Sequence, residues 1–114
     1  MAGWHGILQQ GLDTFATDED RTTQTLFLHG SLKVMLYSPK GNDPQKPHDR
    51  DEFYVIARGS GTFRLGDNAF DFNTGDSIFV PSGVEHRFEK FSDDLVTWVM
   101  FYGPTGGEVD EKEQ

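Results

Sequence analysis

The sequence predicts an all-β fold with at most a short helix near the N-terminus. Short runs of β-forming residues are separated by glycine- and proline-containing turns roughly every eight to twelve residues, which is typical of a β-sandwich or β-barrel. The 114 residues include 10 phenylalanines, 3 tyrosines and 2 tryptophans, which favours a core filled by large aromatic rings.

Length and composition narrow the classes of protein that fit. A chain of 114 residues can bury one hydrophobic core but not two, so we expect a single domain. The absence of cysteine excludes disulfides, thiolate metal ligands and cysteine nucleophiles. The net charge of -9, with no basic patch, predicts no nucleic-acid partner and no anionic-membrane partner.

Hydropathy gives an expectation for the cellular location. The mean hydropathy of -0.57 leaves no stretch that could span a membrane. Residues 1–4 do not begin a charged and then apolar export leader. A cytoplasmic location is therefore expected.

The N-terminal segment, residues 1–22, is expected to hold the helix. Apolar residues at helical spacing lie within 4–12, although Gly6 and Gly11 weaken the helix propensity there. Residues 13–23 are polar and acidic, and we interpret them as a connection to the first strand.

The barrel is expected over residues 23–102. Its strands are predicted at 24–28, 31–37, 52–57, 62–65, 69–72, 78–80, 86–89 and 95–102. Residues 38–47 contain three prolines and read as a loop, and 66–68 read as a hairpin turn. Residues 103–114 are glycine-rich and then acidic, which predicts a mobile tail.

Two histidines and one glutamate form the candidate metal site. His48 and Glu52 are four residues apart at the start of a predicted strand, so they share a face if the backbone there is extended. His86 ends a second stretch that begins at Gly75. Two imidazoles and a carboxylate suit one divalent transition metal, namely iron, manganese, nickel or zinc, and leave coordination positions open.

Both stretches resemble the two motifs of the cupin family. The first motif has two histidines separated by one residue, then a glutamate, and then a glycine after six more residues. His48, Glu52 and Gly59 fit it, whereas Lys46 stands where the first histidine is usual.

The second motif fits without a gap. Gly75, Pro81, Gly83 and His86 have its spacing, and only the closing asparagine is replaced, by Lys90. The resemblance implies a small jelly-roll barrel with a metal held inside it by His48, Glu52 and His86. The glycines and the proline are expected to shape turns rather than to take part in chemistry.

Lys46 is the departure with chemical consequences. A protonated ammonium cannot ligate a metal, and it would repel one or pair with Glu52. The neighbouring Gln45 could lend a carbonyl oxygen as a weak fourth ligand, and water could fill the same position. A Lys46→His substitution is therefore expected to raise metal affinity, which it can do only if that side chain points at the metal.

The interior lining follows from strand parity. If Glu52 faces inward, Tyr54 and Ile56 do so too, and Phe88 accompanies His86. For the last strand, either Trp98, Met100 and Tyr102 or Thr97, Val99 and Phe101 face inward. Either set gives a mostly apolar lining that favours a small organic ligand.

The resemblance implies a metal-dependent enzyme of dioxygenase, isomerase or epimerase type. Tyr54, His29 and Lys46 are its candidate acid–base groups. The alternatives are a non-catalytic binding protein, in which the three ligand-type residues form a buried polar network, and a structural or storage protein. Phenylalanines on both strand parities predict a homodimer, because they cannot all face inward.

Overall fold

The computed structural model describes residues 2–110, which form one helix and eight strands. The elements in chain order are α1 (Leu8–Thr17), β1 (Thr23–His29), β2 (Leu32–Tyr37), β3 (Asp51–Arg58), β4 (Gly61–Leu65), β5 (Asn68–Phe72), β6 (Ser77–Val80), β7 (His86–Phe91) and β8 (Val96–Tyr102). The predicted strands all form, with ends shifted by a few residues. No helix in the described part of the chain is long and apolar enough to cross a membrane.

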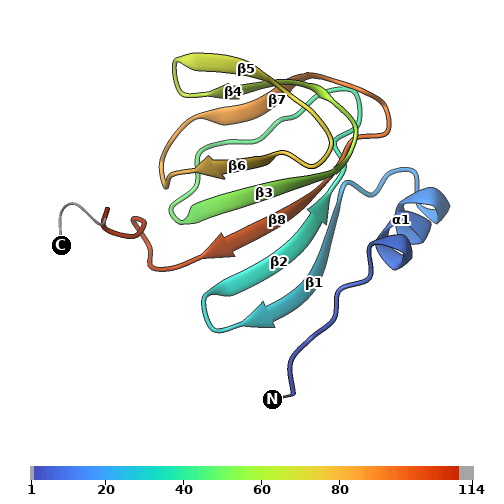
Figure 1. The fold of residues 1–114 in the computed structure, drawn as a ribbon, viewed down its shortest axis with the longest axis horizontal. Coiled ribbons are helices and arrows are strands. Elements are labelled where there is room, and N and C mark those ends of the chain that lie inside the picture. Colours follow the sequence, from blue (N-terminus) through green and yellow to red (C-terminus); the bar gives the residue numbers. More distant parts are fainter. Residues whose placement is uncertain (1, 111–114) are drawn as a thin grey trace.

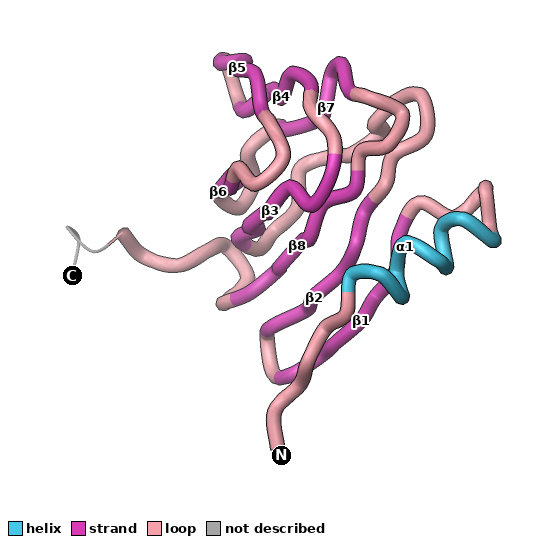
Figure 2. The backbone as a smooth tube through the Cα atoms, turned by 45° about the vertical axis from the view of Figure 1, so that its right-hand side comes forward, coloured by secondary structure: helices cyan, strands magenta, loops and turns pink. Residues whose placement is uncertain are grey.

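The strands make two antiparallel sheets that face each other (Figure 1). The larger sheet has the order β1-β2-β8-β3-β6, and the smaller one has the order β5-β4-β7. The helix lies beside β1 and β2, away from the smaller sheet (Figure 2). The all-β jelly-roll prediction, with one short N-terminal helix, is confirmed.

Aromatic rings fill the space between the sheets, as the composition predicts. Tyr54 from the larger sheet meets Phe63, Phe72 and Phe88 from the smaller one, and all four are at most 1% exposed. Tyr54 lies edge-on to Phe63 and Phe88, with ring centroids 5.6 Å and 5.3 Å away. Such edge-to-face pairs add to the stabilisation that burial already provides.

The helix lies further along the chain than the sequence predicts, because it begins at Leu8, so that residues 4–7 are not helical, and continues to Thr17. Residues 13–17 are helical rather than part of a polar connection, because Phe15 is buried on the outer face of the larger sheet with Leu36 and Val96. Gly11 permits this close approach, since a Cβ atom there would lie 2.2 Å from Leu36 Cδ1. The glycine that weakens helix propensity is therefore the point where the helix touches the sheet.

The motif glycines occupy turns. Gly59, Gly75 and Gly83 have φ angles of +98°, +92° and +80°, a region that other residues rarely adopt. At Gly59 a Cβ atom would also lie 2.8 Å from the Leu95 Cα atom. The expectation that these glycines shape turns is confirmed.

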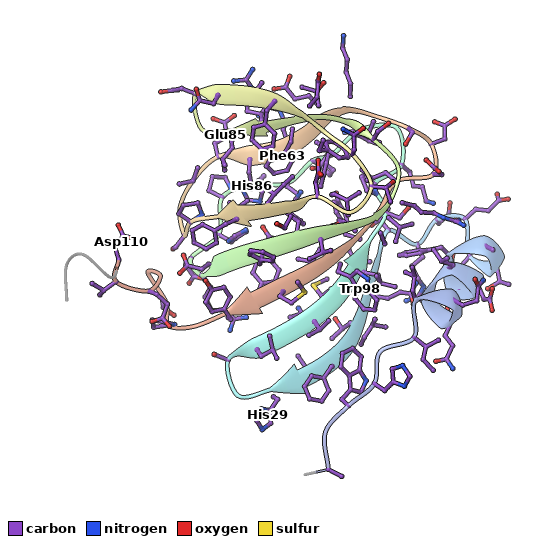
Figure 3. All side chains as sticks on the ribbon, viewed as in Figure 1. His29, Phe63, Glu85, His86, Trp98 and Asp110 are labelled. Atoms are coloured by element: carbon purple, nitrogen blue, oxygen red, sulfur yellow. The ribbon has the colours of Figure 1, made fainter. Side chains whose placement is uncertain are left out.

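The parity of the last strand is now decided. Thr97 and Val99 are buried between the sheets, and Phe101 packs against the same core. Trp98 instead packs on the outer face with the helix, where Figure 3 labels it. The inward positions of Tyr54, Ile56 and Phe88 agree with the prediction from parity.

The described part of the tail contacts the barrel. The Gly106 N–H donates to the Asp49 carbonyl at 2.6 Å, and the Glu108 N–H donates to Asp51 Oδ2 at 2.8 Å. Asp51 is only 4% exposed and also accepts from the Ser82 N–H at 2.9 Å. The prediction of a mobile tail covers residues 103–114, and the last four of these, 111–114, lie outside the described residues.

Candidate metal centre

The three predicted ligand residues come from two facing sheets. Glu52 is near the start of β3, and His48 precedes that strand by a short turn. His86 is the first residue of β7 and lies between the sheets (Figure 3). Glu52 is 1% exposed and His86 is fully buried, whereas the His48 side chain is 22% exposed.

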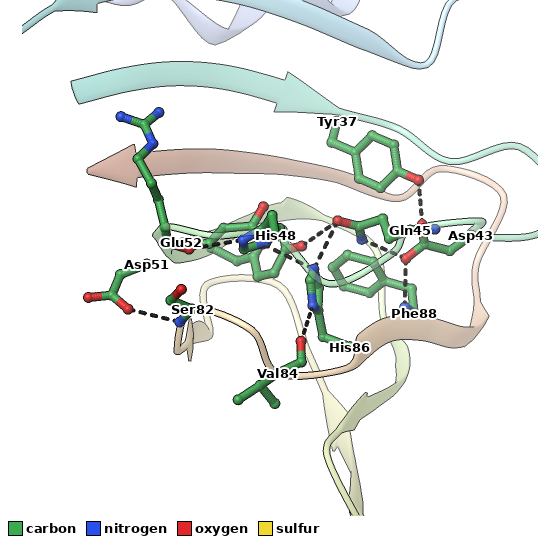
Figure 4. A network of polar contacts seen from close by, with 12 residues as sticks. Tyr37, Asp43, Gln45, His48, Asp51, Glu52, Ser82, Val84, His86 and Phe88 are labelled. Carbon is green, nitrogen blue, oxygen red and sulfur yellow. Dashed lines mark hydrogen bonds and ion pairs between the residues drawn. The ribbon is translucent and has the colours of Figure 1, made fainter. Parts of the chain in front are cut away.

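The side chains converge on one point (Figure 4). Glu52 Oε1 lies 2.7 Å from His48 Nε2 and 3.2 Å from His86 Nε2. One ligand atom from each of the three residues lies within 4.8 Å of the other two. The structure therefore brings the predicted trio together as a possible metal site.

Backbone carbonyls fix the tautomers of both histidines. His48 Nδ1 lies 2.9 Å from the Arg50 carbonyl oxygen, and His86 Nδ1 lies 2.9 Å from that of Val84. A carbonyl can only accept a hydrogen bond, so each Nδ1 must carry a proton. In the neutral form, each Nε2 therefore presents a lone pair to Glu52, as a metal-binding histidine does.

The local charge favours a cation at this point. Burial alone would lower the pKa of His86, but its hydrogen bonds to Glu52 and to the Val84 carbonyl raise that pKa above its ordinary value. Lone pairs that face a carboxylate repel it unless a proton or a metal ion lies between them. Protons and metal ions should therefore compete for the same nitrogen atoms.

Gln45 adds a fourth candidate ligand, an amide oxygen, to the site. Its Oε1 lies 3.2 Å from His86 Nε2 and accepts a hydrogen bond from the Tyr54 hydroxyl at 2.9 Å. Its Nε2 donates to Asp43 Oδ2 at 2.7 Å. Because the amide nitrogen is held by a carboxylate, the amide oxygen must face the site.

Asp43 is the residue that the sequence analysis missed. It is 7% exposed and accepts hydrogen bonds from the Tyr37 hydroxyl at 2.5 Å, from Gln45 Nε2 and from the Phe88 N–H at 2.8 Å. Burial and the bond to Asp43 raise the pKa of Tyr37 far above its ordinary value, so this hydroxyl keeps its proton. No short motif marks Asp43, because Phe88 is 45 residues away in sequence.

Of the other candidate residues, Gln45 and Tyr54 lie at the site, whereas Lys46 and His29 are exposed. Lys46 is exposed, whereas its neighbour Gln45 reaches the site. Tyr54 is fully buried and its hydroxyl is bonded to Gln45. His29 is exposed at the turn between β1 and β2, far from His86 in Figure 3.

This geometry changes the expected outcome at Lys46. We expect Lys46→His to leave zinc affinity within about twofold of the parent, because an exposed side chain does not face the site. Gln45→His, by contrast, places an imidazole at the position that faces His86. Zinc titration of the two metal-stripped variants measures the difference. A clear gain for Lys46→His alone would show that Lys46, not Gln45, points at the metal.

Comparisons with known proteins agree with the fold and the motifs. A family model described as the cupin domain matches residues 33–102. An uncharacterised protein of Streptomyces coelicolor is 37% identical over 76 residues, which are 65% of this chain and 72% of that protein.

Solved structures with low sequence identity share the fold. A cupin-2 domain protein of Shewanella frigidimarina has a TM-score of 0.63 at 16% identity, over 82% of this chain and 92% of that one. A Ralstonia eutropha protein provisionally named a mannose-6-phosphate isomerase has a TM-score of 0.65 at 21% identity, over 90% of this chain and 100% of that one. A chain from a structural study of DMSP lyases has a TM-score of 0.59 at 24% identity, over 69% of this chain and 42% of that one. The chain belongs to the cupin family.

Proposed function

We propose that this protein is a metal-dependent enzyme that acts on a small organic molecule. His48, Glu52 and His86 supply the metal ligands, and the Gln45 amide oxygen supplies a fourth. The observation that carries the proposal is the convergence of two Nε2 atoms and a carboxylate, with the opposite nitrogen of each ring bonded to a backbone carbonyl.

The donor set fits iron(II), manganese, nickel or zinc. Two imidazoles and one carboxylate leave positions open on such an ion, which would polarise a bound oxygen group or bind oxygen next to a substrate. The chain itself holds the ligands rigidly. Both Nδ1 atoms are bonded, and Asp43 fixes the orientation of Gln45.

Proton transfer at the site depends on few groups. Burial and the charge of Glu52 raise the pKa of Tyr54 well above its ordinary value, and Tyr37 is held protonated in the same way. Neither hydroxyl is therefore a base near neutral pH, which leaves the Glu52 carboxylate as the nearest proton acceptor. Oxidation or one-base isomerisation has more support than epimerisation with two independent bases.

The fold comparisons include one protein provisionally named an isomerase and one chain from a study of lyases. Their identities of 21% and 24% support the shared fold and do not specify a substrate for this chain.

A non-catalytic protein with a polar network is the second candidate. The observation in its favour is that, among the described residues, no buried side-chain nitrogen or oxygen lacks a hydrogen-bond partner. The network needs a proton between Glu52 and each Nε2 atom, carried by the ring or by the Glu52 carboxyl group. If both rings carried these protons, two imidazolium rings with centroids 4.7 Å apart would repel each other.

Metal titration distinguishes the two candidates. We expect protein purified without added metal to carry close to one equivalent of a transition metal, and stripped protein to bind one zinc ion. Zinc affinity should rise with pH as the proton on His86 Nε2 is lost, because that proton competes with the metal. Against the effect of burial, the hydrogen bonds of His86 to Glu52 and the Val84 carbonyl raise its pKa above the ordinary value. Elemental analysis and calorimetry at several pH values measure both effects. Absence of metal together with absence of zinc binding at about pH 8 would favour the polar network.

A further inference from the structure

A pocket opens directly beside the candidate metal centre. It has a volume of about 160 Å³. Glu52 and Gln45 form its metal-facing end, and Met35, Val99 and Phe101 form an apolar wall. Of the proposed metal ligands, Glu52 would therefore contact a molecule bound in the pocket, together with Gln45.

Strand register makes the apolar wall continuous with the site. Phe101 on β8 pairs with Glu52 on β3, and Val99 pairs with Met35 on β2. Paired residues point to the same face of a sheet. His48 lies edge-on to Phe101 with ring centroids 4.8 Å apart, so the Phe101 ring lies between His48 and the pocket.

Glu52 is the only charged residue that lines the pocket in the described part of the chain. The Tyr37 hydroxyl also reaches the lining but donates to Asp43. Arg50 lies over Phe101 and donates to the Ser31 carbonyl, and it does not line the pocket. A phosphate or carboxylate on the body of a substrate would thus lie against an apolar wall beside the Glu52 carboxylate, with no counter-ion among the lining residues, which is costly.

Lys33 is the nearby cation that could stabilise an anionic substrate. It pairs with Phe101, so it shares the inner face of the sheet, but it lies outside the pocket lining. The pocket is also smaller than the roughly 300–1,000 Å³ of sites that bind drug-sized ligands. Its size and lining together limit the occupant to a short molecule.

We propose that the substrate is a small, uncharged organic molecule with one oxygen-donor group and a short apolar body. The oxygen donor binds at the metal, and the body packs against Met35, Val99 and Phe101. This inference rests on the proposed function, because it places the donor group on the metal. It excludes sugar phosphates and dicarboxylates as substrates.

Short hydroxamates are suitable probes, because they bind zinc through two oxygens and their tails can be varied. Acetohydroxamate provides the baseline. A 4-methylpentanoyl hydroxamate adds an apolar tail, and the monohydroxamate of succinate replaces the branched end by a carboxylate of similar shape. Calorimetry on zinc-loaded protein measures each affinity.

We expect the apolar tail to increase affinity over acetohydroxamate by at least about tenfold, since each buried methylene contributes roughly fourfold. The carboxylate tail should give no increase. Met35→Lys introduces a cation at the half-buried wall and should reverse this preference. Lys33→Met is the matched control and should leave the preference as it is in the parent.

Zinc titration of each protein comes first, which separates two kinds of failure. Parent protein that binds no zinc overturns both the proposed function and this inference. Parent protein that binds zinc but gains nothing from the apolar tail overturns this inference alone. A preference for the carboxylate tail that disappears in Lys33→Met would also overturn it, and would identify an anionic substrate instead.

Discussion

Replacement of His86 by alanine is expected to lower zinc affinity by more than about 100-fold. Loss of a residue that merely supports a ligand typically costs 10- to 100-fold, and loss of a ligand should cost at least as much. His86 is fully buried, so no other side chain or free water can easily take its position. Zinc titration of stripped protein at about pH 8 gives the measurement, at a pH where proton competition is weak.

The controls separate metal binding from folding. His29→Ala removes an exposed imidazole and should bind zinc as the parent does. Glu52→Gln keeps the side-chain shape but removes the charge, and should lose most of the affinity as well. Circular dichroism checks that each variant retains its β-structure. Equal zinc affinity for His86→Ala and the parent would contradict the metal proposal and leave the polar network.

The fold and the convergence of the three ligand-type residues could be predicted because each of the two motifs is a short-range pattern. Gly75 and Gly83 have positive φ angles that few other residues accept, so they mark turns in the sequence itself. His48 and Glu52 converge across the bends at residues 49–50, so their even spacing predicted a shared face although the backbone between them is not extended throughout. These patterns also fixed which side of β3 faces inward.

Long-range packing could not be predicted in the same way. The helix extends through Phe15 because Gly11 lets it approach Leu36, which belongs to a strand far along the sequence. Asp43 stands in a loop with no periodic pattern, and its partners come from β2 and β7. Burial of a carboxylate becomes evident only when the donors that surround it are known.

The fact that Gln45 rather than Lys46 reaches the site also depends on long-range packing. Prolines at 44 and 47 keep the loop away from a regular strand, so alternation does not say which side chain faces the barrel. The structure shows that Asp43 determines the choice, because it binds the Gln45 amide nitrogen. The family motif specifies only that a histidine is usual at position 46, so it could not predict the hydrogen bond between Gln45 and Asp43.

Removal of that carboxylate should therefore affect both stability and metal binding. Asp43→Ala leaves the Phe88 N–H and the Tyr37 hydroxyl without their buried acceptor, and we expect the free energy of unfolding to fall by about 3 kcal/mol. Denaturant titration measures this loss. Asp93→Ala, which removes an exposed carboxylate, is the control and should change stability by less than about 0.5 kcal/mol.

Asp43 should influence metal affinity by fixing the orientation of the Gln45 amide. Without Asp43 the Gln45 amide can turn its nitrogen toward His86, so zinc affinity should fall by about tenfold. Gln45→Ala should cause a similar loss with a smaller effect on stability. If both residues act through the same oxygen, the double variant should lose about tenfold rather than about 100-fold in zinc affinity. Multiplicative losses would show that Asp43 supports the site independently, through the Phe88 N–H on the strand that carries His86.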